Sequence, residues 1–214
     1  MPATDNWSAN WCADKLKHEH VSQVRVVEDN LVELEIEEMG KVLAATMSLP
    51  AVSLADVPPT ALRPDVQFLL NISKDALFRG DLIKYADRVP MGVGGVGDLL
   101  RAINKKELRR YTTPERGFIL RALSQHDAVS GVEMLNNYTY LIHRHALGAY
   151  QVLVVTEYDV TAEVVRATLQ KFGHSRTILA NNPNGKVTPE AKEAAKNAGV
   201  RIVTFSQFLG ALNS

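Results

Sequence analysis

Alternating apolar and polar positions predict the clearest strand of this chain. Val32, Leu34 and Ile36 alternate with glutamates at the intervening positions, which is the period-two pattern of a strand with one buried face. Apolar runs bounded by turn residues predict further strands at residues 21–27, 41–48, 66–72 and 90–93, and helical spacing predicts helices at residues 8–17, 75–87 and 97–103. The first half is therefore predicted to be a helix, a three-stranded meander, then strand, helix, strand and helix.

The second half of the chain repeats this order. A helix at residues 114–123 precedes strands at residues 129–135, 138–144 and 151–156. The remaining elements are a helix at 161–172, a strand at 177–181, a helix at 189–197, a strand at 200–205 and a helix at 206–212. Thr188 before Pro189 is a helix start signal, and Gly199 is a stop signal.

Matched residues support an internal duplication, because their offset is nearly constant. The pairs are His18 and His126, Val21 and Val129, Ser22 and Ser130, Val24 and Val132, Val42 and Val152, Leu43 and Leu153, Thr46 and Thr156, Leu69 and Leu179, Asn71 and Asn181, Leu100 and Leu209, and Ala102 and Ala211. We therefore predict an α/β protein of two tandem related halves, at residues 1–104 and 113–214, joined by a basic linker at residues 105–112.

Composition narrows the function classes. Among 214 residues, 24 basic and 24 acidic side chains balance, so binding to an anionic partner must come from a local patch. A single cysteine, Cys12, excludes an internal disulfide and a cysteine zinc site, and it is interpreted as an apolar position on a helix. The first residues lack a signal-peptide pattern, and no apolar run is long enough to span a bilayer. We expect a cytoplasmic protein without a membrane partner.

The order of elements resembles the restriction-endonuclease-like fold. The end of the chain, at residues 188–209, is similar to the end of the Mrr-like branch of that superfamily and has the sequence TPEAKEAAKNAGVRIVTFSQFL. The resemblance covers the second half and, through the repeat, the first. It implies two carboxylates and a lysine around one magnesium ion, which activates water against a phosphodiester.

The sequence departs from that catalytic pattern in both halves. Residues 41–48 offer no acid and no following lysine, so the first half is expected to be inert. In the second half the third strand ends in Glu157 and Asp159, which share a face and could bind a divalent metal such as magnesium. The alternative is that Asp159 or Thr161 caps the next helix and Glu157 ends a solvated strand.

Two loops could hold a ligand. Residues 92–97 are rich in glycine and lie where a strand leads into a helix, where backbone amides can bind phosphate; the alternative is a tight turn with Asp98 near the helix start. Asn182, Asn184 and Lys186 follow a strand, where open α/β sheets bind ligands. Asparagine–proline and asparagine–glycine pairs are equally typical of an ordinary turn.

Positive charge gathers between the two halves. The cations proposed to contact a phosphate backbone are Arg101, Lys105, Lys106, Arg109, Arg110 and Arg116. The leading hypothesis is a nucleic-acid-binding, nuclease-like protein with an incomplete catalytic set, acting on DNA in restriction, defence or repair. The alternatives are an active metal-dependent nuclease using Glu157 and Asp159, and a protein-interaction or regulatory module with a homodimer or protein partner.

Overall fold

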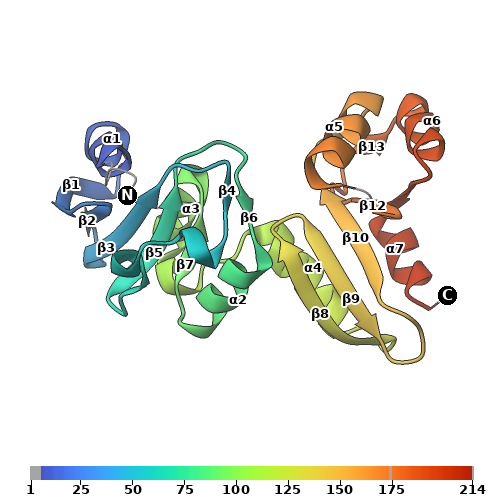
Figure 1. Cartoon of the computed structure of the whole chain (residues 1–214), viewed down its shortest axis with the longest axis horizontal. Coiled ribbons are helices and arrows are strands. Elements are labelled where there is room, and N and C mark those ends of the chain that lie inside the picture. The colour runs from blue at the N-terminus through green and yellow to red at the C-terminus, as the bar shows by residue number, and fades with distance from the viewer. Residues whose placement is uncertain (1–5, 174, 214) are drawn as a thin grey trace. The chain divides into compact units, whose positions relative to one another are not determined.

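The structure is a computed structural model that describes residues 6–173 and 175–213 (Figure 1). The chain divides into two compact units, Met1–Thr113 (unit 1) and Pro114–Ser214 (unit 2). None of the helices in the described ranges has the length and apolar character that a membrane-spanning segment needs.

Unit 1 is built around a five-stranded mixed sheet. Its helices and strands are α1 (Trp7–Lys15), β1 (Val21–Glu28), β2 (Leu31–Ile36), β3 (Gly40–Met47), β4 (Ala51–Val52), β5 (Val66–Asn71), β6 (Leu77–Phe78), α2 (Gly80–Arg88), β7 (Gly92–Gly94) and α3 (Val96–Lys105). The strand order is β1-β2-β3-β5-β7, antiparallel from β1 to β3 and parallel from β3 to β7. Three short 3₁₀ helices complete the unit, η1 (Leu54–Asp56), η2 (Pro59–Leu62) and η3 (Leu108–Arg110).

Unit 2 has a sheet of the same order. Its elements are α4 (Pro114–Ser124), β8 (Val129–Asn136), β9 (Thr139–Arg144), β10 (Tyr150–Val155), β11 (Asp159–Val160), α5 (Ala162–Phe172), β12 (Thr177–Ala180), β13 (Lys186–Val187), α6 (Pro189–Asn197), β14 (Arg201–Thr204) and α7 (Phe205–Ala211). The order β8-β9-β10-β12-β14 is again antiparallel and then parallel. The predicted α/β class and the two halves are confirmed.

The two sheets also agree in register. The first hairpin of each unit has a register shift at its start, between Val21 and Gln23 in one and between Val129 and Gly131 in the other. Small two-stranded sheets recur at equivalent places, β4 with β6 and β11 with β13. These agreements support the internal duplication, which stays a prediction about origin.

Helices cover both faces of the unit 2 sheet. On one face, α4 and α7 bury Ile119 and Phe208 against β9, β10, β12 and β14. On the other face, α5 and α6 bury Val165 and Ala195 against β10 and β12. In unit 1, α1 and α3 pack on the equivalent of the first face. The unit 2 sheet is thus buried on two sides, as the long apolar runs of its parallel strands require.

Cys12 lies on α1 in the core of unit 1 and is fully buried. Burial raises the pKa of its thiol to about 12, because a thiolate is poorly solvated in an apolar core. The interpretation of Cys12 as an apolar helix position is confirmed.

Two parts of the sequence prediction differ from the structure by more than a residue or two at an element end. The helix predicted at residues 75–87 begins only at Gly80, because β6 (Leu77–Phe78) pairs with β4 first. The segment predicted as a linker at residues 105–112 packs on unit 1. Leu108 and Tyr111 are buried in the unit 1 core, so these residues are part of a folded unit.

Candidate nucleic-acid interface

A groove with a volume of about 1440 Å³ opens on unit 2. It follows β14, the last strand of the sheet order, and reaches the carboxyl ends of β10 and β12. Glu157, Asn182 and Thr204 line it where these three parallel strands end. The start of α4 and the helices α6 and α7 supply its remaining walls. Open α/β sheets commonly bind ligands at such carboxyl ends.

The lining of this groove is positively charged. Its basic side chains are Arg176, Lys186, Lys192, Lys196 and Arg201, against two carboxylates, Glu115 and Glu157. Lys192 and Lys196 lie four residues apart on α6, so they share one face of that helix. All five cations are exposed. Because the whole chain is neutral, this groove is a local concentration of positive potential.

Exposed aromatic rings lie beside these cations. Phe118 is 53% exposed, and its ring centroid is 4.7 Å from that of Phe205. Tyr158 is 63% exposed, and all three rings line the groove. Large exposed aromatic side chains are unusual on a protein surface. Together with lysine and arginine they form the combination that binds stacked bases and phosphates.

The loop between β12 and β13 places Asn182 and Lys186 at the groove, whereas Asn184 is not among its lining residues. Asn182 is held by its own loop, because its Oδ1 accepts from the Asn184 amide at 3.1 Å and its Nδ2 donates to the Thr156 carbonyl at 3.4 Å. A side chain at Gly185 would place a Cβ 2.2 Å from the Tyr158 carbonyl oxygen. The loop therefore has the hydrogen bonds of an ordinary turn, and it also places Asn182 and Lys186 at the groove.

The two proposed catalytic carboxylates have different surroundings. Glu157 is exposed and lines the groove. Asp159 lies on β11, and its Oδ1 is 4.0 Å from Nζ of Lys186 on β13. The start of α5 is capped by Thr161, whose hydroxyl accepts from the Val164 amide at 3.3 Å. Among the described residues, no three His, Cys, Asp or Glu side chains come together as a metal site.

The predicted basic segment is divided between the two units, and several of its cations already have partners. Arg101 pairs with Asp98 at 3.4 Å, and Lys106 pairs with Glu38. The Lys106 ammonium holds the pKa of the Glu38 carboxyl below its usual value. Lys105 and Arg110 are exposed, whereas Arg116 is half-buried on α4 of unit 2.

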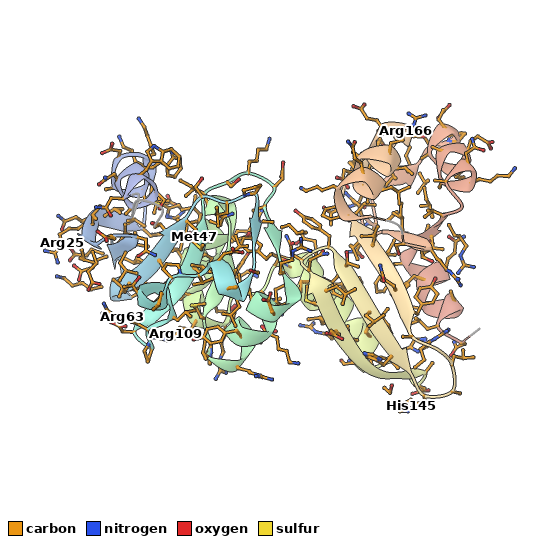
Figure 2. All side chains as sticks on the ribbon, viewed as in Figure 1. Arg25, Met47, Arg63, Arg109, His145 and Arg166 are labelled. Carbon is orange, nitrogen blue, oxygen red and sulfur yellow. The ribbon has the colours of Figure 1, made fainter. Side chains whose placement is uncertain are left out.

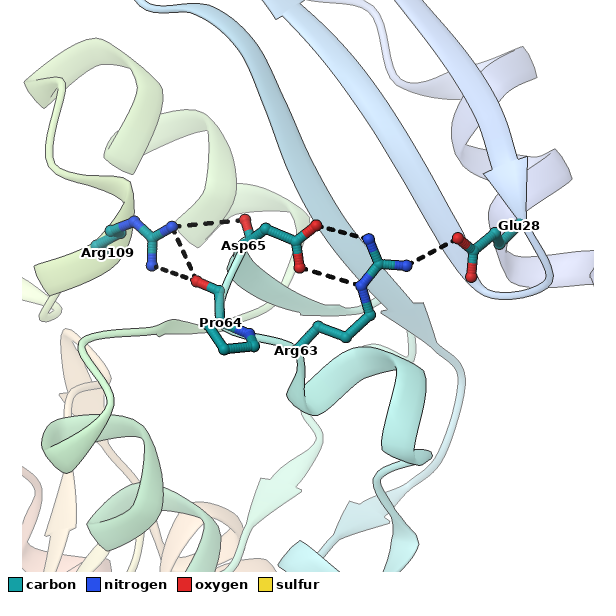
Figure 3. A network of polar contacts seen from close by, with 5 residues as sticks. All are labelled: Glu28, Arg63, Pro64, Asp65 and Arg109. Carbon is teal, nitrogen blue, oxygen red and sulfur yellow. Dashed lines mark hydrogen bonds and ion pairs between the residues drawn. The ribbon is translucent and has the colours of Figure 1, made fainter.

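Arg109 is part of a network that holds the surface of unit 1 (Figure 3). Its guanidinium donates two hydrogen bonds of 3.1 Å to the Pro64 carbonyl. Next to it, Arg63 bridges Asp65 and Glu28 at 2.6 and 2.7 Å. This contact ties η3 to the loop before β5. Arg109 therefore has structural partners within its own unit.

The glycine-rich segment at residues 92–97 forms β7, the single connecting residue Gly95 and the first residues of α3. The Gly95 amide donates a hydrogen bond to the Asp98 carboxylate at 3.0 Å, so the Asp98 side chain caps the start of α3. A Cβ at Gly94 would lie 2.5 Å from the Asp98 side chain. The interpretation as a tight turn with Asp98 near the helix start is confirmed.

Searches of protein-family models, curated proteins and solved structures found no match to this chain. The functional argument therefore depends on the geometry of the molecule. Sequence reasoning missed four groove cations, Arg176, Lys192, Lys196 and Arg201. The spacing of Lys192 and Lys196 on a predicted helix was a usable signal, but the arginines at the starts of two strands gave none.

Proposed function

We propose that this protein binds nucleic acid through the groove of unit 2 and does not cleave it. The observation that carries the proposal is the excess of five cations over two carboxylates in one groove of a neutral chain. Lysine and arginine facing a phosphate backbone release counterions, which is the main source of affinity in nucleic-acid binding.

The aromatic side chains favour nucleic acid over a simple polyanion. Phe118, Tyr158 and Phe205 line the same groove as the cations, and bases stack on such rings without regard to sequence. The order of elements in both units also supports the proposal, since it resembles that of restriction-endonuclease-like proteins.

Fluorescence anisotropy with labelled DNA and RNA, single- and double-stranded, tests this proposal. Binding should weaken as salt rises, and the double variant Lys192→Gln with Lys196→Gln should reduce the salt slope by about 1–2. The matched control combines Arg166→Gln (Arg166 is labelled in Figure 2) with Lys84→Gln, which removes two exposed cations that do not line the groove. Equal binding by the two double variants would overturn the groove as the binding surface. No binding to any nucleic acid would instead favour a protein-interaction module.

One contact favours a second candidate, an active metal-dependent nuclease. Nζ of Lys186 on β13 lies 4.0 Å from Oδ1 of Asp159, so the fold brings a lysine to this carboxylate although none follows it closely in sequence. This candidate predicts cleavage that requires Mg²⁺ or Mn²⁺ and stops with EDTA. If Glu157→Ala or Asp159→Ala also abolishes that cleavage, the protein is a nuclease and not only a binder. Intact oligonucleotides under all metal conditions would remove this candidate.

A further inference from the structure

A second cavity of unit 2 lies at the amino ends of β12 and β14 and has a volume of about 690 Å³. The polar side chains that matter are Arg144, Tyr150, Ser175, Arg176, Thr177 and Arg201. Of the described residues that line it, none is acidic. We call this cavity the arginine pocket. Three guanidinium groups and three hydroxyls with no carboxylate among them are a typical environment for an oxyanion.

Hydrogen bonds hold the walls of the arginine pocket in place. Tyr150 and Thr177 share a hydrogen bond of 2.8 Å between their hydroxyls, and Arg201 donates to the Tyr150 hydroxyl at 3.0 Å. Arg144 donates from Nε to the Gly148 carbonyl at 2.8 Å, and its guanidinium lies 5.4 Å from the centre of the Tyr150 ring. These contacts orient Arg144 and Arg201 in advance, which lowers the entropic cost of binding.

The arginine pocket adjoins the groove. Arg176 and Arg201 line both cavities. Both side chains belong to exposed residues, and no ion pair to an acidic group is found for either among the described residues. A strand lying along the groove would therefore bring its end, or one of its phosphates, to these two guanidinium groups.

Unit 1 provides an internal comparison for this pocket. Phe68 pairs with Gly92 in unit 1 where Thr177 pairs with Arg201 in unit 2. The chain after α3 folds back at this place, with Tyr111 6.3 Å from the Phe68 ring and the Leu108 carbonyl oxygen 2.2 Å from where a Gly92 Cβ would be. The equivalent space in unit 1 is filled by protein, so the fold does not by itself require an open pocket.

We infer that the arginine pocket binds the terminal phosphate of a nucleic-acid strand whose body lies in the groove. The inference rests on the proposed function and adds recognition of a strand end. A terminal phosphate monoester carries nearly two negative charges at neutral pH, whereas each internal phosphodiester carries one. Several guanidinium groups around one site bind a doubly charged phosphate more tightly than a singly charged one. Each arginine can also donate two parallel hydrogen bonds to the phosphate oxygens.

The experiment compares oligonucleotides of one sequence that end in a 5′-phosphate, a 3′-phosphate or hydroxyls only. Each carries a fluorophore at the opposite end or within the strand, and anisotropy is measured in EDTA so that no strand is cut. We expect one terminal phosphate to lower Kd about tenfold, the scale of a charge-assisted hydrogen bond. In Arg176→Gln and in Arg201→Gln, the Kd for the phosphorylated oligonucleotide should become close to the Kd for the oligonucleotide with hydroxyl ends.

Arg166→Gln is the matched control, because Arg166 is an exposed cation of α5 that lines neither cavity (Figure 2). It should keep the preference for the phosphorylated end. Arg201→Gln removes the hydrogen bond that Arg201 donates to the Tyr150 hydroxyl, so it could also disturb the fold. Arg176→Gln removes no such bond, and it therefore separates loss of phosphate binding from misfolding. Equal affinity for phosphate and hydroxyl ends in the unmodified protein would overturn this inference and leave the proposed function intact. Failure of every oligonucleotide to bind would overturn both.

Discussion

Gly92 and Arg201 occupy the same place in two sheets of the same order. Each starts the last strand of its unit, opposite Phe68 in one and Thr177 in the other. In unit 1 the chain that follows α3 packs against this place, and glycine leaves room for the Leu108 carbonyl. In unit 2 the residue is an exposed arginine between two cavities.

This difference shows where two similar frameworks can take different roles. The hairpin register and the parallel order are the same in both units, because a slip by one residue would turn every buried side chain outward. The start of the last strand is packed differently in the two units. Unit 1 places its own chain against Gly92, whereas in unit 2 Arg201 lines two cavities that also contain other cations.

Removal of the Leu108 side chain should have the largest effect. Leu108 is 2% exposed in the unit 1 core, so Leu108→Ala should lower the free energy of unfolding of unit 1 by about 2–4 kcal/mol through lost burial and a residual cavity. Both tryptophans of the chain, Trp7 and Trp11, belong to unit 1. Their fluorescence during urea unfolding measures this unit. The exposed control Phe118→Ala in unit 2 should leave that transition unchanged.

The substitution Gly92→Ala should destabilise unit 1 at the position where the two units differ. A Cβ there would lie 2.2 Å from the Leu108 carbonyl oxygen and 2.5 Å from the Phe68 ring, so we expect Gly92→Ala to destabilise unit 1 by about 1–3 kcal/mol through overpacking. The same fluorescence measurement reports it. Arg201→Ala, at the equivalent place in unit 2, should leave the tryptophan transition where it is. A tolerated alanine at position 92 would show that η3 packs only loosely against Gly92.

Acid should weaken unit 1 by a smaller amount. The Arg63 guanidinium lowers the pKa of Asp65, and Lys41 lowers that of Glu33. A lowered folded pKa means that the contribution to stability is complete above the ordinary values of 3.8 and 4.5 and is lost as pH falls through the lowered ones. Arg63→Gln should reduce the part of this loss of unfolding free energy that comes from Asp65, measured by urea unfolding at several pH values. Arg88→Gln, on the exposed end of α2, should keep it.

Local signals in the sequence predicted most of the elements. The bounds of β2 and α6 match the prediction, because strict alternation marks β2 and Thr188 with Pro189 marks the start of α6. The start of α2 was missed because β6 is stabilised by a partner strand far away in sequence. The groove was missed for the same reason, since Arg176, Lys192 and Arg201 come together only when β12, α6 and β14 pack.

The position of Cys12 has a practical consequence for measurements of motion and distance. It is the only cysteine of the chain, and its buried thiol stays protonated at neutral pH because its pKa is about 12. Maleimides and other thiol reagents attack the thiolate. A cysteine placed at an exposed site such as Lys84 or Arg166 would therefore take a spin label or fluorophore at one defined position, without first replacing Cys12 in the core.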